Sequence, residues 1–184
     1  SRPQHSVDIS ESDGVRQLHF GSDWVQGAMR IARPWSLELA YTREMMAGLL
    51  MRNAKSWPRH ALLIGLGAGS LVKFIYRNLP DTRMTVVEIN PQVEFVARQF
   101  FKLPDGPRRL EIVIGCGADY MLSGNRQFDY ILSDGFDPDA RAGALDTTPF
   151  YQASRARLTD DGLFCANLLG RHRSFQGRIE RISN

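Results

Sequence analysis

Cysteine and long apolar runs are both scarce in this sequence. Its 184 residues include only two cysteines, Cys116 and Cys165, each within an apolar or glycine-rich segment. Two cysteines cannot build a framework of disulfide bonds, and the first residues do not resemble a secretory signal, so we expect a reducing, cytoplasmic setting. No apolar run approaches the roughly 18 residues that a membrane-spanning helix needs, which excludes membrane insertion.

An excess of charge of one sign is also missing. Lysine and arginine number 23 against 20 aspartates and glutamates, and the basic residues are scattered apart from those in segment 171–181. This pattern argues against a nucleic-acid partner. The four histidines lie far apart, and neither a His-x-x-x-His pair nor a calcium-loop spacing occurs, so we predict no metal site. The composition, 43% hydrophobic and 23% charged, is that of an ordinary globular protein.

Short strand-like segments fill the first part of the chain. Residues 6–31 contain "VDIS", "VRQLHF" and "WVQGAMRI", separated by turn-forming residues. These segments predict a small N-terminal β region over residues 1–35. The apolar spacing of residues 36–52 then predicts a helix, with Ser36 as its N-cap.

From residue 36 to residue 184 the pattern predicts a second, α/β domain. Five nearly continuous apolar segments alternate with helical ones: "ALLIG", "MTVVEI", "LEIVI", "FDYILSD" and "GLFCANLL". Apolar strands that alternate with helices are typical of a parallel, doubly wound sheet with both faces covered. A ligand is then expected at the carboxyl ends of the strands, near the point where the strand order reverses.

Three glycines follow the first of these strands in "GLGAGS". Gly65, Gly67 and Gly69 allow a sharp turn and close approach of the backbone to a ligand, and the next helix offers free N–H groups. Glu88 ends the second strand, about 20 residues further on, where an acidic side chain can accept hydrogen bonds from ribose hydroxyls. The pair favours a nucleoside-bearing cofactor. The alternative is a tight turn without a ligand and a solvated strand end.

Carboxylates cluster after the fourth strand. The segment "SDGFDPDARAGALD" carries Asp134, Asp137, Asp139 and Asp146 against the single Arg141, in a glycine- and proline-containing stretch too long for a tight turn. Long loops beside a ligand crevice are often lids. The carboxylates can hold a cation, and an organic amine fits better than a metal ion because no fixed ligand spacing occurs. A solvated loop is the alternative for Asp137 and Asp139.

These motifs resemble the polyamine aminopropyltransferase family, the spermidine synthase group. The resemblance covers most of the chain and rests on "GLGAGS", "VVEINPQVEFVARQFF", "DYILSDGFDP" and "LDTTPFYQASRARLTDDGLFCANL". It implies a small β domain before a methyltransferase-like Rossmann domain. It also implies transfer of an aminopropyl group from decarboxylated S-adenosylmethionine, the co-substrate, to a diamine such as putrescine, without a metal.

The resemblance assigns roles to the motif residues. Asp134 matches the catalytic aspartate and would accept the proton of the attacking amine, whose pKa is about 10.4 in the free state. Asp137 would hold the amine or the amino end of the donor, and Glu88 the ribose. The backbone of Gly65 to Gly69 would carry the methionine-derived part of the donor.

Two positions on the donor side, Ala68 and Cys116, depart from the family pattern. Ala68 stands where the glycine loop usually carries an acidic residue, which leaves the choice of donor open. Cys116 stands where an acid usually receives the adenine amino group, and Asp119 is positioned to substitute for it. Both are candidate cofactor-binding residues.

The acceptor side also departs from the pattern. Thr42 and Arg43 fall where the family has the Tyr-Gln pair that helps to bind the diamine, and an arginine there would repel a cationic acceptor. The neighbouring Tyr41 is a candidate substrate-binding residue. Gln26, in "WVQGAM", lies where related bacterial sequences often have a glutamine, and it is expected at the crevice.

Two other functions compete with aminopropyl transfer. An S-adenosylmethionine-dependent methyltransferase would share the nucleoside half, and a non-catalytic nucleoside-binding module would explain the departures. A homodimer formed through the β region is expected, because small strand arrays expose edges. Residues 36–184 are expected to form the catalytic domain, and only residues 170–184 follow its fifth strand. We therefore expect either that a C-terminal part of this domain is absent from the sequence or that its sheet ends early.

Overall fold

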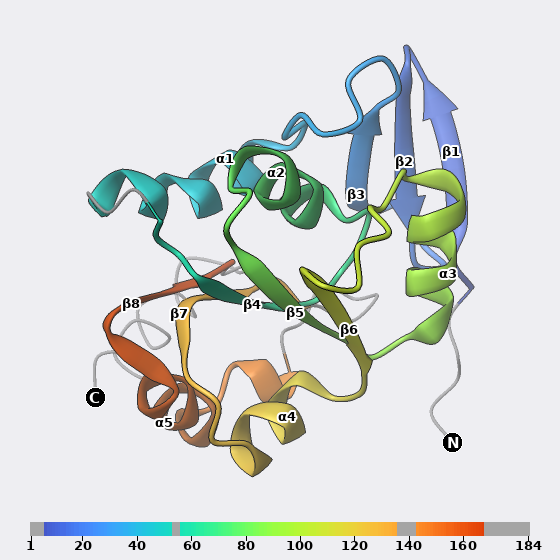
Figure 1. The fold of residues 1–184 in the computed structure, drawn as a ribbon. Coiled ribbons are helices and arrows are strands. Elements are labelled where there is room, and N and C mark those ends of the chain that lie inside the picture. The colour runs from blue at the N-terminus through green and yellow to red at the C-terminus, as the bar shows by residue number, and fades with distance from the viewer. Residues whose placement is uncertain (1–5, 53–55, 136–142, 168–184) are drawn as a thin grey trace.

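The structure is a computed structural model that describes residues 6–52, 56–135 and 143–167, arranged around two separate sheets. A three-stranded sheet from the start of the chain stands beside a larger five-stranded one (Figure 1). The α/β class with a preceding β region is therefore confirmed.

The first sheet is antiparallel, with its strands in chain order. It consists of β1 (Asp8–Ser12), β2 (Val15–His19) and β3 (Val25–Arg30). Asp13 and Gly14, at φ 52° and 74°, form the turn between β1 and β2, as suits a two-residue hairpin loop. The three strands predicted from the sequence are all present.

The next element is shorter than the sequence indicated. It consists of α1 (Ala40–Met46) and the 3-10 helix η1 (Ala47–Met51). The prediction that Ser36 caps this helix is wrong, because Leu39 occupies the N-cap position in an extended conformation without a side-chain cap. Arg43 instead turns back and donates hydrogen bonds to the carbonyl oxygens of Leu37 and Glu38. The helix thus satisfies the backbone of the extended segment before it.

The second sheet is fully parallel. Its strands are β4 (His60–Ile64), β5 (Arg83–Glu88), β6 (Leu110–Ile114), β7 (Phe128–Ser133) and β8 (Leu158–Ala166), in the spatial order β6-β5-β4-β7-β8. The intervening helices are α2 (Ser70–Asn78), α3 (Pro91–Phe100), α4 (Gly117–Ser123), η2 (Gly143–Leu145) and α5 (Thr148–Ala156). The order reverses between β4 and β7, as a doubly wound sheet requires.

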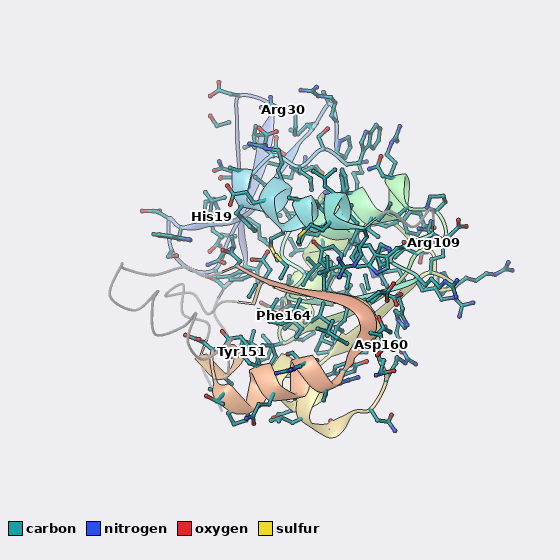
Figure 2. The ribbon with its side chains drawn as sticks, turned by 90° about the vertical axis from the view of Figure 1, so that its left-hand side faces the viewer. His19, Arg30, Arg109, Tyr151, Asp160 and Phe164 are labelled. Carbon is teal, nitrogen blue, oxygen red and sulfur yellow. The ribbon has the colours of Figure 1, made fainter. Side chains whose placement is uncertain are left out.

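Both faces of the central strand of this sheet, β4, are buried. Ala61 and Leu63 of β4 pack with α1, α2 and α3, whereas Leu62 and Ile64 pack with α4 and α5 (Figure 1). Alternate residues of a strand point to opposite faces, so a strand covered on both faces is apolar throughout. Tyr151 of α5 meets Phe164 of β8 edge to face, with ring centroids 5.9 Å apart (Figure 2).

The first sheet packs directly on the turn between β4 and α2. A Cβ atom added to Gly27 of β3 would lie 2.7 Å from Cβ of Ala68, and the Ser70 hydroxyl donates to the carbonyl oxygen of Ala28 at 3.1 Å. The N-terminal sheet therefore forms one side of the glycine turn. Among the described helices, none is long and apolar enough to cross a membrane.

Candidate active site

The glycine turn and the acidic segment meet where the strand order reverses. The amide of Asp134, which follows β7, donates to the carbonyl oxygen of Ile64 at the end of β4 at 2.8 Å. Gly65 has φ +93°, and a Cβ atom there would lie 2.5 Å from the carbonyl oxygen of Asp134. Only glycine fits at position 65. The glycine turn and the acidic segment, which lie far apart in the sequence, are therefore in direct backbone contact.

Glu88 organises the rest of the turn. Its buried carboxylate accepts hydrogen bonds from the amides of Leu66 and Asn90, each at 2.9 Å. Burial raises the pKa of Glu88, and the backbone hydrogen bonds oppose that rise. Gly67 and Gly69 have positive φ values of 53° and 69°. The glycine turn and Glu88 therefore lie side by side, and the Glu88 carboxylate is hydrogen-bonded to the turn itself.

The carboxyl group of Asp134 is removed from solvent and hydrogen-bonded to two side chains. Burial raises its pKa to about 6, and hydrogen bonds from Asn167 and Tyr41 oppose the rise. Nδ2 of Asn167 donates to Oδ1 of Asp134 at 2.9 Å. The sequence analysis missed Asn167, although its place directly after the fifth strand put it at the same edge of the sheet.

Tyr41 reaches Asp134 from α1. The two side chains are hydrogen-bonded, and burial together with the charge of Asp134 raises the pKa of the Tyr41 phenol. Thr42 is buried and its hydroxyl donates to the carbonyl oxygen of Leu39, while Arg43 is exposed and bonded to backbone carbonyls. The phenol beside Asp134 thus comes from Tyr41, and the guanidinium of Arg43 is held by the segment that precedes the helix.

The sequence analysis expects Gln26 at the crevice, and the structure places the backbone of this β3 residue beside the glycine turn. A Cβ atom on Gly67 would be 3.5 Å from the carbonyl oxygen of Gln26. Its side-chain nitrogen Nε2 is buried and has no hydrogen-bond partner within the described residues. A buried donor without a partner is uncommon in folded proteins, and a ligand can supply the acceptor.

The carboxyl ends of β5 and β6 form the neighbouring part of the site. The amide of Gly115 donates to the carbonyl oxygen of Glu88 at 2.9 Å. Cys116 is the N-cap of α4 and packs against its apolar cluster, whereas Asp119 is exposed in the first turn of the helix. The sequence analysis did not single out Ile114, whose side chain is exposed beside this turn.

The acidic segment is described only at its ends. Asp137 and Asp139 lie outside the described residues. Asp146, in the part that follows, accepts a hydrogen bond from the Tyr151 hydroxyl at 2.9 Å. In the ranges that the structure describes, no three His, Cys, Asp or Glu side chains are grouped so that they could hold a metal ion.

Comparison with known proteins places this arrangement in a family. Residues 38–171, from just before α1 to just beyond β8, match the spermine/spermidine synthase domain. The chain belongs to the spermine/spermidine synthase family. The matched range contains Gly65, Glu88, Asp134 and Asn167, whereas the three-stranded sheet precedes it.

Known relatives agree with the spermidine synthase assignment. A polyamine aminopropyltransferase of Neisseria meningitidis serogroup A is 43% identical over 176 residues, which cover 96% of this chain and 66% of that protein. A spermidine synthase solved with the transition-state analogue AdoDATO gives a TM-score of 0.68 at 27% identity, covering 96% of this chain and 64% of that one. The chain therefore spans slightly less than two thirds of these relatives.

One methyltransferase structure is also similar. Human methyltransferase-like protein 13, solved with SAH, gives a TM-score of 0.70 at 29% identity, covering 78% of this chain and 71% of that one. The spermidine synthase and methyltransferase likenesses together confirm the predicted methyltransferase-like fold.

Proposed function

We propose that this chain carries the catalytic part of a polyamine aminopropyltransferase. The reaction moves an aminopropyl group from decarboxylated S-adenosylmethionine to a diamine such as putrescine. The observation that supports it most is the position of Asp134, a carboxylate of raised pKa directly beside the glycine turn. The membership of the family supports the same reaction.

The donor would bind along the carboxyl ends of β4, β5 and β6. The backbone of Gly65 to Gly69 would carry the methionine-derived part, next to the N-terminus of α2. Glu88, whose carboxylate also accepts hydrogen bonds from the amides of Leu66 and Asn90, would bind the ribose hydroxyls. Asp119 would receive the adenine amino group, with Cys116 and the exposed Ile114 against the ring.

The acceptor would bind between Asp134, Tyr41 and Gln26. Its nitrogen attacks the methylene carbon bonded to the sulfonium, the new C–N bond forms as the C–S bond breaks, and methylthioadenosine leaves as a neutral thioether. The ammonium proton passes to Asp134, whose pKa of about 6 lies close to a neutral working pH. We propose that Asp137 holds the charged end of the amine or of the donor.

Methyl transfer from S-adenosylmethionine is the second candidate. The similarity to human methyltransferase-like protein 13, solved with SAH, favours it, because the nucleoside half of the site would serve either donor. Ala68 also leaves the choice of donor open, because its methyl group places no charge on the glycine turn beside the tail of the donor.

Mass spectrometry distinguishes the two reactions. The protein is incubated either with decarboxylated S-adenosylmethionine and a pool of diamines, or with S-adenosylmethionine and the same pool. Methylthioadenosine together with an aminopropylated amine would establish the proposed transfer, whereas S-adenosylhomocysteine with a methylated product would replace it. Tight nucleoside binding without either product would indicate a non-catalytic module.

A matched pair of variants tests the base. Asp134→Asn should lower turnover by about 10² or more, because the amide cannot accept the proton. The control is Asp105→Asn, since the Asp105 side chain is 93% exposed in the loop that follows α3. Near-normal turnover of Asp134→Asn would refute the role of Asp134.

A further inference from the structure

Asn167 is fixed beside Asp134 by its own backbone. It directly follows β8, and its amide donates to the carbonyl oxygen of Ser133 at 2.9 Å. Ser133 is the residue before Asp134, so this hydrogen bond at the end of the β7–β8 pairing sets the distance between the side chains of Asn167 and Asp134. From this position Nδ2 of Asn167 reaches Oδ1 of Asp134 at 2.9 Å.

An amide donor acts on one protonation state of a carboxyl group. The N–H group stabilises the ionised oxygen and gains less from a protonated one, so this contact favours the charged form against burial. It also removes one of the acceptor directions of Asp134 and fixes the orientation of the carboxylate. An attacking amine would use the lone pairs that Asn167 and Tyr41 leave free.

Asp134 shifts the pKa of two described side chains, the Tyr41 phenol on α1 and the Cys165 thiol on β8. Burial and the charge of Asp134 raise the pKa of both groups, so both are neutral at pH 7. The hydrogen bonds from Asn167 and Tyr41 are therefore what opposes burial at Asp134.

We infer that Asn167 is a positioning residue whose side-chain amide holds the Asp134 carboxylate ionised and correctly oriented to accept a proton. The catalytic consequence rests on the proposed function, whereas the effect on the ionisation of Asp134 does not. The inference extends the site to β8, a strand to which no role was assigned.

The pH dependence of kcat/KM tests the catalytic consequence. In Asn167→Leu and Asn167→Ala the acid limb of the profile should move upward by about one pH unit, because a hydrogen bond to a charged group is lost. Asn167→Gln should restore the limb at least in part, since it keeps the amide. An acid limb that stays in place while kcat falls would overturn the inference and leave Asn167 a packing residue.

Unfolding experiments test the ionisation without any catalysis. The pKa of Asp134 is about 6 in the folded state against 3.8 for an ordinary aspartate, so its ionisation destabilises the fold as pH rises between these two values. In Asn167→Ala the loss should continue to higher pH, so its Tm deficit should grow between pH 5 and pH 8. In the Asp134→Asn background the deficit should no longer depend on pH.

The two experiments separate the two ideas. A pH-dependent deficit in a protein that gives no aminopropylated product would support the inference and refute the proposed function. A deficit that is independent of pH with Asp134 present would refute the inference, whatever reaction the protein performs. The Ala and Leu variants together guard against a fold lost through the shape of one side chain.

Discussion

At the scale of single residues, the burial that raises the pKa of Asp134 also has a cost in stability. Burial raises its pKa to about 6, so the folded state binds its proton more tightly than the unfolded state does. Between the unfolded value and pH 6 the stability therefore falls as pH rises, and above pH 6 the full cost of a buried carboxylate is present. Sites that need such a group are commonly less stable than they could be.

This cost predicts a stability gain when the Asp134 carboxylate is replaced by an amide. The Tm of Asp134→Asn relative to the parent should rise by about 2–4 °C from pH 5 to pH 8, because the amide carries no charge. The measurement is thermal unfolding monitored by circular dichroism at both pH values. If the difference were the same at both, Asp134 would titrate as an exposed carboxyl group does.

Gly65 should be intolerant of a side chain for two reasons. Its φ of +93° strains any L residue, and a Cβ atom would lie 2.5 Å from the carbonyl oxygen of Asp134. Gly14 isolates the first reason, since it has φ +74° with no atom within 4 Å of an added Cβ. Gly65→Ala should therefore cost about 1–3 kcal/mol more than Gly14→Ala in urea unfolding, and it alone should reduce activity. Equal costs would mean that β4 and β7 move apart freely.

The residues around Asp134 show what the sequence could predict. Gly65 and Asp134 were identified because each directly follows an apolar strand, and parallel strands bring their carboxyl ends together. Tyr41 and Asn167 were harder, since their role depends on which side chain of α1 and which residue after β8 faces the same carboxylate. Such contacts depend on helix orientation and strand register, which one sequence does not reveal.

At the scale of elements, two arginines join helices to the sheet. Arg109, just before β6, donates to the carbonyl oxygens of Tyr76 and Leu79 at the C-terminal end of α2 and to that of Thr82, just before β5. Arg157, just before β8, donates to the carbonyl oxygen of Tyr120 in the last turn of α4 and to that of Arg126 in the loop before β7. Each guanidinium satisfies carbonyls that a helix end leaves unpaired.

Arg157 should be the more sensitive of the two, because it is 4% exposed. Arg157→Met should lower the free energy of unfolding by about 2–4 kcal/mol, since buried carbonyls lose their donors. Arg157→Lys should recover little, because one ammonium cannot replace the planar fork. The control is Arg155→Met on the exposed face of α5. A loss of stability of similar size in this control would mean that α5 itself is sensitive, and not the hydrogen bonds that Arg157 donates.

The start of α1 shows how local sequence misleads at this scale. Ser36 has the chemistry of an N-cap, yet its amide closes a turn with the carbonyl oxygen of Arg33, and the extended Leu39 is the N-cap of α1. Arg43 of α1 donates hydrogen bonds to the carbonyl oxygens of Leu37 and Glu38, and this interaction forms only once the helix exists. It favours a helix that begins after Leu39 over the local preference of Ser36 for an N-cap position. The β strands were predicted more reliably because burial on both faces leaves a continuous apolar pattern.

At the scale of the whole molecule, the N-terminal sheet and the α/β domain share the candidate site. Leu18 and Met29 of the small sheet join the same apolar cluster as α1, α2 and α3. β3 approaches so closely that Gly27 leaves no room for a Cβ beside Ala68. The sheet is therefore structurally coupled to the glycine turn, and the sequence boundary near residue 35 does not separate it from the site.

This coupling predicts that a methyl group on β3 weakens nucleoside binding. In Gly27→Ala the added Cβ would lie 2.7 Å from Cβ and 2.8 Å from the amide nitrogen of Ala68, so the turn must shift. The Kd for methylthioadenosine, measured by calorimetry, should rise about tenfold, the equivalent of about 1.4 kcal/mol. Adding Ala68→Gly removes one of the two clashes, so it should restore part of the affinity and leave the backbone contribution. An unchanged Kd with a lowered Tm would mean that the first sheet supports the fold without shaping the turn.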